Sequence, residues 1–305
     1  MDEILKQEQK IIASGDGHSK FELILPRLEV AIEKENPDTI VFMGDNVDDW
    51  NASAEDNIRS LTYLADWIDD KKDNINIVCL LGNHDMQYKN GTRCSGTNLD
   101  IRVDLLPVME RLNLQGAYAA NNILFTHAGL TRTWADHNGI KEWMDIDMIV
   151  AVLNETANRY PDAFDSCGQE RGGKGYPGPL WAGQNELLDD CFIGINQVVG
   201  HTPVRRAFSL PVTEDDGTKY FLAFCDSMSL MSDNYPIGNG DFLISRGKNQ
   251  IEPMEMDSLM AECGLASWGH AVNAWFAKKQ NLYIPRKQIN INDIKIDKAQ
   301  ANLEL

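Results

Sequence analysis

Residues that commonly bind metal ions recur along this chain in short motifs that contain glycine. In chain order the motifs are Gly15-Asp16-Gly17-His18, Gly44-Asp45-Asn46-Val47-Asp48, Gly82-Asn83-His84-Asp85, Thr126-His127-Ala128-Gly129 and Gly200-His201-Thr202-Pro203. Carboxylate, amide and imidazole groups together suit divalent ions such as Mn, Fe or Zn. Two such ions about 3.5–4 Å apart can hold the attacking and leaving oxygens of a phosphoryl transfer. The ordered set therefore predicts a two-metal site for phosphoryl chemistry.

Each motif directly follows a short apolar segment. These segments are Ile11 to Ala13, Thr39 to Met43, Ile75 to Leu81, Ile123 to Phe125, and Val198 with Val199. Continuous apolar runs of this length indicate strands that are buried on both faces. Polar residues just past the carboxyl ends of such strands meet at one edge of an open α/β sheet, where ligands bind. We therefore expect the motifs to converge.

Helical patterns alternate with the strands. One expected helix contains Pro26, and because proline lacks an amide hydrogen we expect Pro26 in the first turn. A second expected helix begins with Ser53 and Asp56, which form a capping-box pattern. Two further strands are expected over residues 219–225 and 242–245. The alternation predicts a layered α/β fold.

Residues 138–195 interrupt this alternation. They begin with an expected helix from Ile140 to Asn154 and continue into a glycine-rich loop over residues 171–179. Long loops beside a site often act as lids. We therefore treat the segment as an insertion, or lid, within the catalytic domain.

The C-terminal part follows a different pattern. A helix is expected from about Met256 to Lys279, weakened at Gly264, and a polar tail follows Ile289. The expected organisation is a catalytic domain over residues 1–250 and a C-terminal helical extension with a tail over residues 251–305.

Composition narrows the choice of partners and compartment. The 305 residues carry a formal net charge of −18, and the pI is about 4.7. Such acidity opposes non-specific binding to nucleic acids and anionic membranes. The 6 cysteines form no C-x-x-C pair, and neither an apolar signal core nor a membrane-spanning run is present. We expect a cytoplasmic protein with reduced thiols. The oligomeric state stays open.

The ordered motifs resemble those of the calcineurin-like metallophosphoesterases. The family pattern is GD-x-H-G, GD-x-V-D-R-G, G-N-H-E, H-G-G or H-A-G, and a late histidine, often in G-H-T-P. The chain reads GDGHS, GDNVDD, GNHDM, HAGL and GHTP. It looks closest to the phosphoprotein-phosphatase branch, which includes lambda-type phage phosphatases and symmetric diadenosine tetraphosphatases. The resemblance implies a layered α/β/β/α sandwich, here with an inserted helical and loop segment and a C-terminal extension.

The resemblance also implies a role for each matching residue. The implied metal ligands are Asp16 and His18 for the first ion, Asp45 bridging both ions, and Asn83, His127 and His201 for the second. His84 would not bind metal but would act as general acid, oriented by Asp48. The chemistry agrees with this, because imidazole titrates in the range that a general acid needs. Manganese is the expected metal, with iron and zinc as alternatives.

Two departures affect substrate binding. Asp49 occupies the position of the family arginine in GD-x-V-D-R-G, and no arginine closely follows Asp85. In the family such an arginine grips the substrate phosphate, so here the grip must come from elsewhere or be weaker. Arg171, Arg205 and Arg206 are the candidates, and Asn83 is expected to contact the substrate as well. Asp226 is open to two interpretations, a hydrogen bond to a metal ligand or a simple turn cap.

The leading function is a metal-dependent phosphatase for phosphomonoesters, with phosphoserine or phosphothreonine in proteins as the expected substrate. A metal-bridging hydroxide would attack phosphorus, and His84 would protonate the leaving group. One alternative is a dinucleoside polyphosphate hydrolase of the Ap4A type, suggested by Gly178-Pro179-Leu180-Trp181. A second alternative, from a different class, is a catalytically inactive metal-binding scaffold.

Overall fold

Two mixed β-sheets form the centre of the molecule. The computed structural model describes residues 8–281. The two five-stranded sheets have the orders β10-β9-β1-β2-β3 and β4-β5-β6-β8-β7. The strands of the first are β10 (Glu252–Met254), β9 (Phe242–Ser245), β1 (Ile11–Ser14), β2 (Thr39–Phe42) and β3 (Asn76–Cys79). Those of the second are β4 (Tyr118–Ala120), β5 (Ile123–Phe125), β6 (Asn196–Val199), β8 (Lys219–Phe224) and β7 (Phe208–Thr213).

Parallel strands lie next to one another in both sheets. β1, β2 and β3 are parallel in the first sheet, and β5, β6 and β8 are parallel in the second. Antiparallel strands flank each group, including the hairpin of β4 and β5. The loops that leave the parallel strands therefore emerge along the same edge of each sheet.

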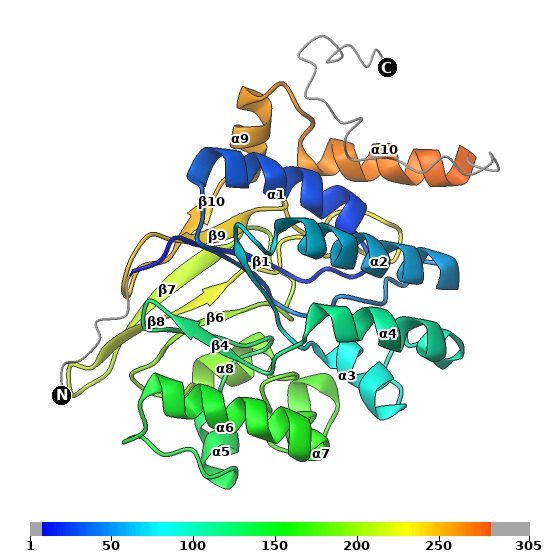
Figure 1. The fold of residues 1–305 in the computed structure, drawn as a ribbon. Helices are drawn as coiled ribbons and strands as arrows, with labels where there is room; N and C mark the ends of the chain where they lie inside the picture. Colours follow the sequence, from blue (N-terminus) through cyan, green and yellow to red (C-terminus); the bar gives the residue numbers. More distant parts are fainter. Residues whose placement is uncertain (1–7, 282–305) are drawn as a thin grey trace.

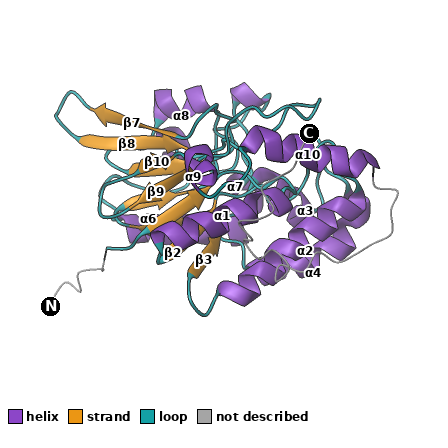
Figure 2. Cartoon of the chain, turned by 90° about the horizontal axis from the view of Figure 1, so that it is seen from above, coloured by secondary structure: helices purple, strands orange, loops and turns teal. Residues whose placement is uncertain are grey.

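Helices cover the outer face of each sheet (Figure 1). Over the first sheet lie α1 (Phe21–Glu35), α2 (Ala54–Lys71), α4 (Arg102–Leu112), α9 (Met256–Glu262) and α10 (Trp268–Asn281). Over the second lie α5 (Arg132–His137), α6 (Ile146–Arg159), α7 (Pro161–Phe164) and α8 (Gln184–Asp190). The remaining helix, α3 (Asn83–Asn90), follows β3, and short 3₁₀ turns lie at η1 (Leu99–Ile101) and η2 (Gln169–Arg171). Seen from above, α1 and α9 lie over the strands of the first sheet (Figure 2).

The strands alternate their side chains between the layers. Ile11 and Ala13 share a buried cluster with Val198 of the second sheet, so this cluster lies between the sheets. Ile12 instead joins the cluster beneath α1 and α2, and Val199 joins the cluster beneath α8. Successive strand residues point to opposite faces, so every central strand is buried on both sides. The expected α/β/β/α sandwich is confirmed.

The expected place of Pro26 is wrong. The helix α1 begins at Phe21, so Pro26 lies inside it, in the second turn. An interior proline costs a helix about 3 kcal/mol. Phe21 and Ile24 are completely buried, and each contributes about 1.5–3 kcal/mol. The free energy gained by burying the first turn thus offsets the cost of the interior proline. Local helix propensity does not include this gain from burial.

The ends of two other helices differ from those expected from the sequence. α6 begins at Ile146 rather than Ile140, because Asp145 caps it by accepting a hydrogen bond from the Met148 amide at 2.8 Å. The C-terminal helix is divided into α9 and α10, and Gly264 between them has a φ of +71°. The capping box of Ser53 and Asp56 is present as expected. The tail after Ile289 lies outside the described residues.

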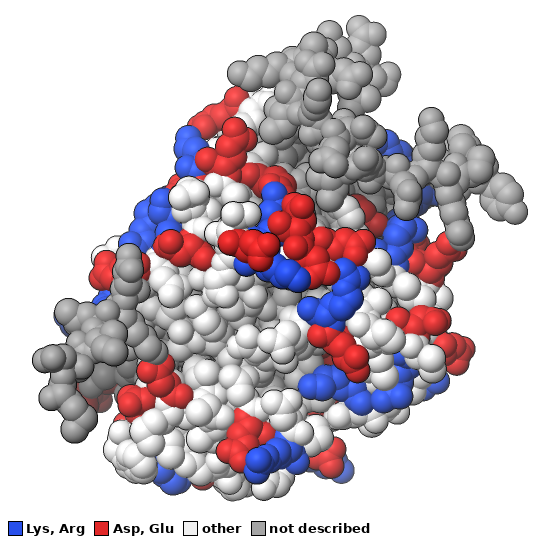
Figure 3. Space-filling model, in the orientation of Figure 1, with Lys and Arg blue, Asp and Glu red and all other residues white. Residues whose placement is uncertain are grey.

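Ion pairs connect the outer helices. Arg59 of α2 lies 3.1 Å from Glu22 of α1, and Lys71 of α2 lies 3.0 Å from Glu29 of α1. Acidic and basic side chains are intermixed over this face (Figure 3). Exposed pairs contribute little stability, so the buried clusters hold the layers together. Within residues 8–281, no helix has the length and apolar character needed to cross a membrane.

Candidate active site

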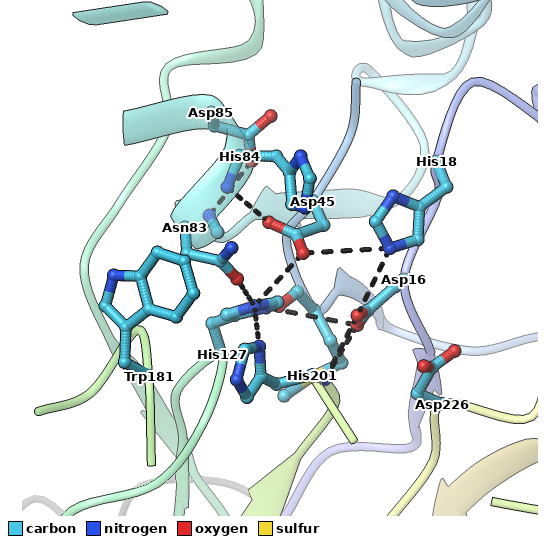
Figure 4. Close-up of polar contacts among 12 residues, drawn as sticks. Asp16, His18, Asp45, Asn83, His84, Asp85, His127, Trp181, His201 and Asp226 are labelled. Carbon is cyan, nitrogen blue, oxygen red and sulfur yellow. Dashed lines mark hydrogen bonds and ion pairs between the residues drawn. The ribbon is translucent and has the colours of Figure 1, made fainter. Parts of the chain in front are cut away.

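The motif residues gather where the two sheets meet at the carboxyl ends of their parallel strands. Asp16 and Asp45 follow β1 and β2 of the first sheet, and His127 and His201 follow β5 and β6 of the second. Asn83 opens α3 just beyond β3. Figure 4 shows these side chains pointing toward one another. The predicted convergence of the motifs is therefore seen in the structure.

One group of donor atoms centres on His127. Its Nδ1 lies 2.8 Å from the Met43 carbonyl oxygen, which can only accept, so Nδ1 carries the hydrogen. Nε2 then directs a lone pair at Asn83 Oδ1 (3.0 Å), His201 Nδ1 (3.1 Å) and Asp45 Oδ2 (3.4 Å). Such converging lone pairs repel one another unless a cation lies among them.

A second group centres on His18. Its Nδ1 donates to the Asp48 carbonyl oxygen at 2.7 Å, so its Nε2 also presents a lone pair. That Nε2 lies 3.7 Å from Asp45 Oδ2 and 3.8 Å from Asp16 Oδ2. Asp45 therefore lies between the two groups and contacts both, which is the position that a bridging ligand requires.

The residues present fit a pair of metal ions. Two buried sets have donor atoms within 4.8 Å of one another, namely His18, Asp45 and His84, and Asp45, His127 and His201. His201 Nε2 is buried without a hydrogen-bond partner, which is unusual for a ring nitrogen. Imidazole and carboxylate donors of this kind suit Mn, Fe or Zn. The first set includes His84, so the geometry alone leaves His84 within reach of an ion.

Strained backbone accompanies these side chains. Asp45, His18 and His201 have φ values of +47°, +40° and +61°, a region that residues other than glycine rarely occupy. Outliers of this kind cluster at functional sites, where the surroundings hold them. Gly82 is needed for a different, steric reason, because a Cβ there would lie 2.1 Å from the Asp45 amide nitrogen.

The start of α3 brings His84 to the site. The His84 amide donates to Asp45 Oδ1 at 2.8 Å, so an unpaired N–H of the helix N-terminus holds the shared carboxylate. The His84 ring contacts Asp48 through Nδ1 and Oδ2 at 3.1 Å. The Tyr88 hydroxyl donates to the other oxygen of Asp48 at 2.5 Å. Asp48 is thus held from two sides, by the His84 ring and by the Tyr88 hydroxyl.

Charge in the site favours added cations. Burial and the neighbouring Asp226 raise the pKa of Asp16 well above its usual value. Burial opposes a charged His127, yet Asp45 and Asp16 outweigh it and raise the pKa of His127 to about 9. Burial and then the Lys20 charge lower the pKa of His18 to about 3, which leaves that ring neutral. A positive charge is therefore favoured beside His127, whether a proton or a metal ion supplies it.

His84 has the opposite tendency to His18. Burial opposes its charged form, but Asp45 and Asp48 outweigh burial and raise the pKa of His84 well above its usual value. The protonated imidazole is consequently stabilised at neutral pH. A protonated histidine beside a cluster of metal ligands is chemically able to donate a proton to a departing oxygen.

The three arginine candidates lie in different places. Arg171 Nη2 donates to Thr202 Oγ1 at 2.9 Å, next to His201. Burial, His127 and then Arg171 lower the pKa of His201, which indicates that the guanidinium is close enough to act on this ring. Arg206 is exposed and lies 3.8 Å from Glu255. Arg205 is also exposed, and its carbonyl oxygen accepts from the Asn239 amide. Of the three, Arg171 lies at the rim of the cluster.

Several supporting residues escaped the sequence analysis. Lys20 is buried and lies 3.6 Å from Asp49, so the residue that replaces the family arginine is paired with a cation. Asp85 accepts from the Gly82 amide at 2.9 Å and braces the start of α3. Asp165 accepts from Trp181 Nε1 at 2.6 Å. The motif GNHD contained Asp85, but no pattern marked the other contacts.

Trp181 and Asp226 complete the surroundings (Figure 4). The Trp181 ring lies 5.9 Å from the His201 ring, at 82° to it. Asp226 is completely buried and accepts from Ser229 Oγ at 2.8 Å. Its charge acts on Asp16. Asp226 therefore both holds a local turn and influences a predicted ligand.

Comparison with known proteins agrees with this geometry. Residues 9–215 match the calcineurin-like phosphoesterase family. No curated protein shows significant similarity to the sequence.

Several solved structures show a distant similarity to this chain. A cold-active protein-tyrosine phosphatase of a psychrophilic Shewanella species has 16% identity and a TM-score of 0.47, over 81% of this chain and 80% of that one. A serine/threonine phosphatase from Saccharomyces cerevisiae has 16% identity and a TM-score of 0.43, over 81% and 79%. A dimetal phosphatase from Danio rerio has 11% identity and a TM-score of 0.31, over 80% and 98%.

The family match covers more than two thirds of the chain and includes every predicted metal ligand. The buried His and Asp sets supply donors for the metal ions on which this family depends. The chain therefore belongs to the calcineurin-like phosphoesterase family and is a metal-dependent phosphoric ester hydrolase.

Proposed function

We propose that this protein is a phosphomonoesterase that removes phosphate from phosphoserine and phosphothreonine in proteins. The observation that carries the proposal is the position of His84. Its ring is buried against the metal-ligand cluster, and its Nδ1 is 3.1 Å from an Asp48 oxygen. A scaffold that only binds metal has no need for an oriented, protonated imidazole at this point.

Six residues are proposed to hold two divalent ions, with manganese as the proposed metal. The proposed ligands are Asp16, His18, Asp45, Asn83, His127 and His201. The position of Asp45, 3.7 Å from His18 Nε2 and 3.4 Å from His127 Nε2, supports a bridging role. When bound, the ions would lower the pKa of water and neutralise the charge on the phosphate.

The protein residues would position the substrate and move a proton. Arg171 and Asn83 bind the phosphate oxygens, and charge-assisted contacts from arginine are among the stronger hydrogen bonds. The oxygen of a water molecule forms a bond to phosphorus as the ester P–O bond breaks. His84 donates its proton to the departing oxygen, giving an alcohol, and the proton lost by the water restores His84. Asp48 stabilises the imidazolium before transfer and keeps Nδ1 protonated afterwards.

We also propose an organisation around this site. Residues 1–250 form the catalytic domain with the 138–195 segment as its lid, and residues 251–305 form an extension. The contact of Arg171 with Thr202 supports a lid role, since it joins the segment to the residue after His201. All 6 cysteines lie within residues 8–281 and are free thiols, which supports a reducing, cytoplasmic location.

A parallel turnover screen tests the proposal. The full-length protein loaded with Mn²⁺ is assayed on phosphoserine and phosphothreonine peptides, mononucleotides and diadenosine tetraphosphate. We expect phosphate release from the peptides with the highest kcat/KM. A higher kcat/KM on diadenosine tetraphosphate would favour the dinucleotide hydrolase instead. Full metal occupancy without turnover of any substrate would identify a scaffold.

A further inference from the structure

Trp50 places an exposed aromatic ring beside His84. Its side chain is 54% exposed, whereas His18 and His84 are only 5% and 6% exposed. The Trp50 ring centroid lies 5.6 Å from that of His84 at 78°, and 5.5 Å from that of His18 at 47°. The two imidazoles are themselves 5.2 Å apart. The indole is thus the most exposed of three mutually contacting rings.

The indole is fixed although it is exposed. Trp50 Nε1 donates to Ser95 Oγ at 3.1 Å. The backbone around it forms a turn, in which the Ala52 amide donates to the Asp49 carbonyl oxygen at 2.9 Å. The Asp49 side chain accepts from the Asn51 amide at 2.8 Å and is itself buried. A ring held by both its turn and its own N–H loses little entropy when a ligand binds.

A glycine, Gly96, lies beside both Trp50 and His84. A Cβ added at Gly96 would lie 3.6 Å from Trp50 Nε1 and 3.8 Å from His84 Cε1. Any larger side chain at position 96 would therefore extend near both rings, and the φ of +92° also favours glycine there. Trp50 belongs to none of the buried hydrophobic clusters of the described residues, so packing does not explain an indole here.

We propose that Trp50 binds the aromatic ring of an aryl phosphate, such as the side chain of phosphotyrosine, as its oxygen departs beside His84. This inference rests on the proposed phosphomonoesterase activity and extends it from alkyl to aryl esters. In an aryl ester the ring is bonded directly to the departing oxygen. An oxygen within hydrogen-bond reach of His84 therefore brings its ring to the neighbouring indole. Aromatic pairs are favourable at centroid distances of about 4.5–7 Å.

The length of the leaving group separates this substrate class from nucleotides. In a nucleotide a ribose stands between the phosphate oxygen and the base, so a base would lie beyond Trp50 when the oxygen is at His84. The chemical step is the same as for alkyl esters. Water oxygen bonds to phosphorus, the bond from phosphorus to the aryl oxygen breaks, and the phenolate oxygen takes the His84 proton.

The test compares an aryl and an alkyl ester in the same peptide sequence. The kcat/KM of the Mn²⁺-loaded full-length protein is measured on a phosphotyrosine peptide, its phosphoserine counterpart and phenyl phosphate. In Trp50→Ala we expect the ratio of aryl to alkyl kcat/KM to fall about threefold to tenfold, the usual worth of an aromatic pair. Trp50→Phe should keep most of the ratio. Trp143→Ala removes another exposed indole, which is 71% exposed, and as the control it should keep all of the ratio.

A binding measurement makes the inference independent of turnover. Calorimetry with phenylphosphonate and methylphosphonate should show a preference for the phenyl compound that Trp50→Ala removes. A fall in kcat/KM by the same factor for aryl and alkyl esters would overturn the inference, because Trp50 would then only shield the site. So would an unchanged ratio in Trp50→Ala or equal binding of the two phosphonates. If the protein lacks the proposed phosphomonoesterase activity altogether, the parent protein will instead turn over none of the esters. Activity on phenyl phosphate but not on the phosphotyrosine peptide would show that Trp50 binds the ring of small aryl esters rather than that of phosphotyrosine in a peptide.

Discussion

Replacing His84 by asparagine separates its two contacts. The backbone amide of residue 84 holds Asp45 Oδ1 at 2.8 Å, and this bond survives the change. The imidazole contact with Asp48 at 3.1 Å is lost. We therefore expect His84→Asn to keep both metal ions while losing turnover, because the ligand set stays intact and only the proton donor is removed.

The size of the loss follows from the role of the side chain. General acid catalysis is worth about 10²–10⁴-fold, which corresponds to roughly 2.7–5.4 kcal/mol of barrier. Phenyl phosphate and p-nitrophenyl phosphate present nearly the same ring to Trp50 but differ in how much their departing oxygen needs a proton. The loss in kcat should therefore be larger for phenyl phosphate. Elemental analysis of the same preparations counts the metal ions.

Two results would contradict this reasoning. Equal losses in kcat on the two aryl phosphates would show that His84 is not the general acid. Loss of metal in His84→Asn would make His84 a ligand, as its place in one of the two donor sets permits. His137→Asn, at an exposed histidine outside the site, is the control and should match the parent.

Three further changes test the surrounding geometry. Asp45→Asn should lose both ions because Asp45 Oδ2 faces both histidine groups, and full occupancy by elemental analysis would rule out the bridge. Arg171→Ala should raise KM about tenfold with little change in kcat, because it removes a contact that is equally strong in the ground state and the transition state. Arg206→Ala is the control and should match the parent. A fall in kcat alone would show that Arg171 acts mainly in the transition state. Gly82→Ala should lower the melting temperature and the metal content, because its Cβ would lie 2.1 Å from the Asp45 nitrogen, at a cost of about 1–3 kcal/mol. Gly269→Ala, with nothing within 4 Å, should be tolerated in thermal unfolding, and equal effects of the two glycine changes would refute the steric argument.

Residues at strand ends could be placed from the sequence because the rule that positions them is local. Asp16 and Asp45 each follow a short apolar run and a glycine, and parallel strands deliver such residues to a common edge. The contact of Asp48 with His84 was implied by the resemblance of these motifs to the family pattern. The capping box of Ser53 was also readable, since it spans only one helical turn.

Contacts made by loops and buried helices depended on tertiary packing. Arg171 reaches Thr202 across 31 positions of sequence, so no local pattern distinguished it from Arg205 or Arg206. The interior place of Pro26 was decided by the burial of the first turn of α1, which outweighs the lost helical hydrogen bond.

The sequence by itself determined the fold class and which polar residues follow the strand ends, because strand periodicity and short motifs encode them within a few residues. Only the tertiary structure decided which arginine lies at the rim and that Trp50 stands beside His84. Those positions depend on how the loops after β2 and α3, and the 138–195 segment, pack against elements far away in the chain. The free energy of that packing is shared among many distant side chains, so no single stretch of sequence carries it.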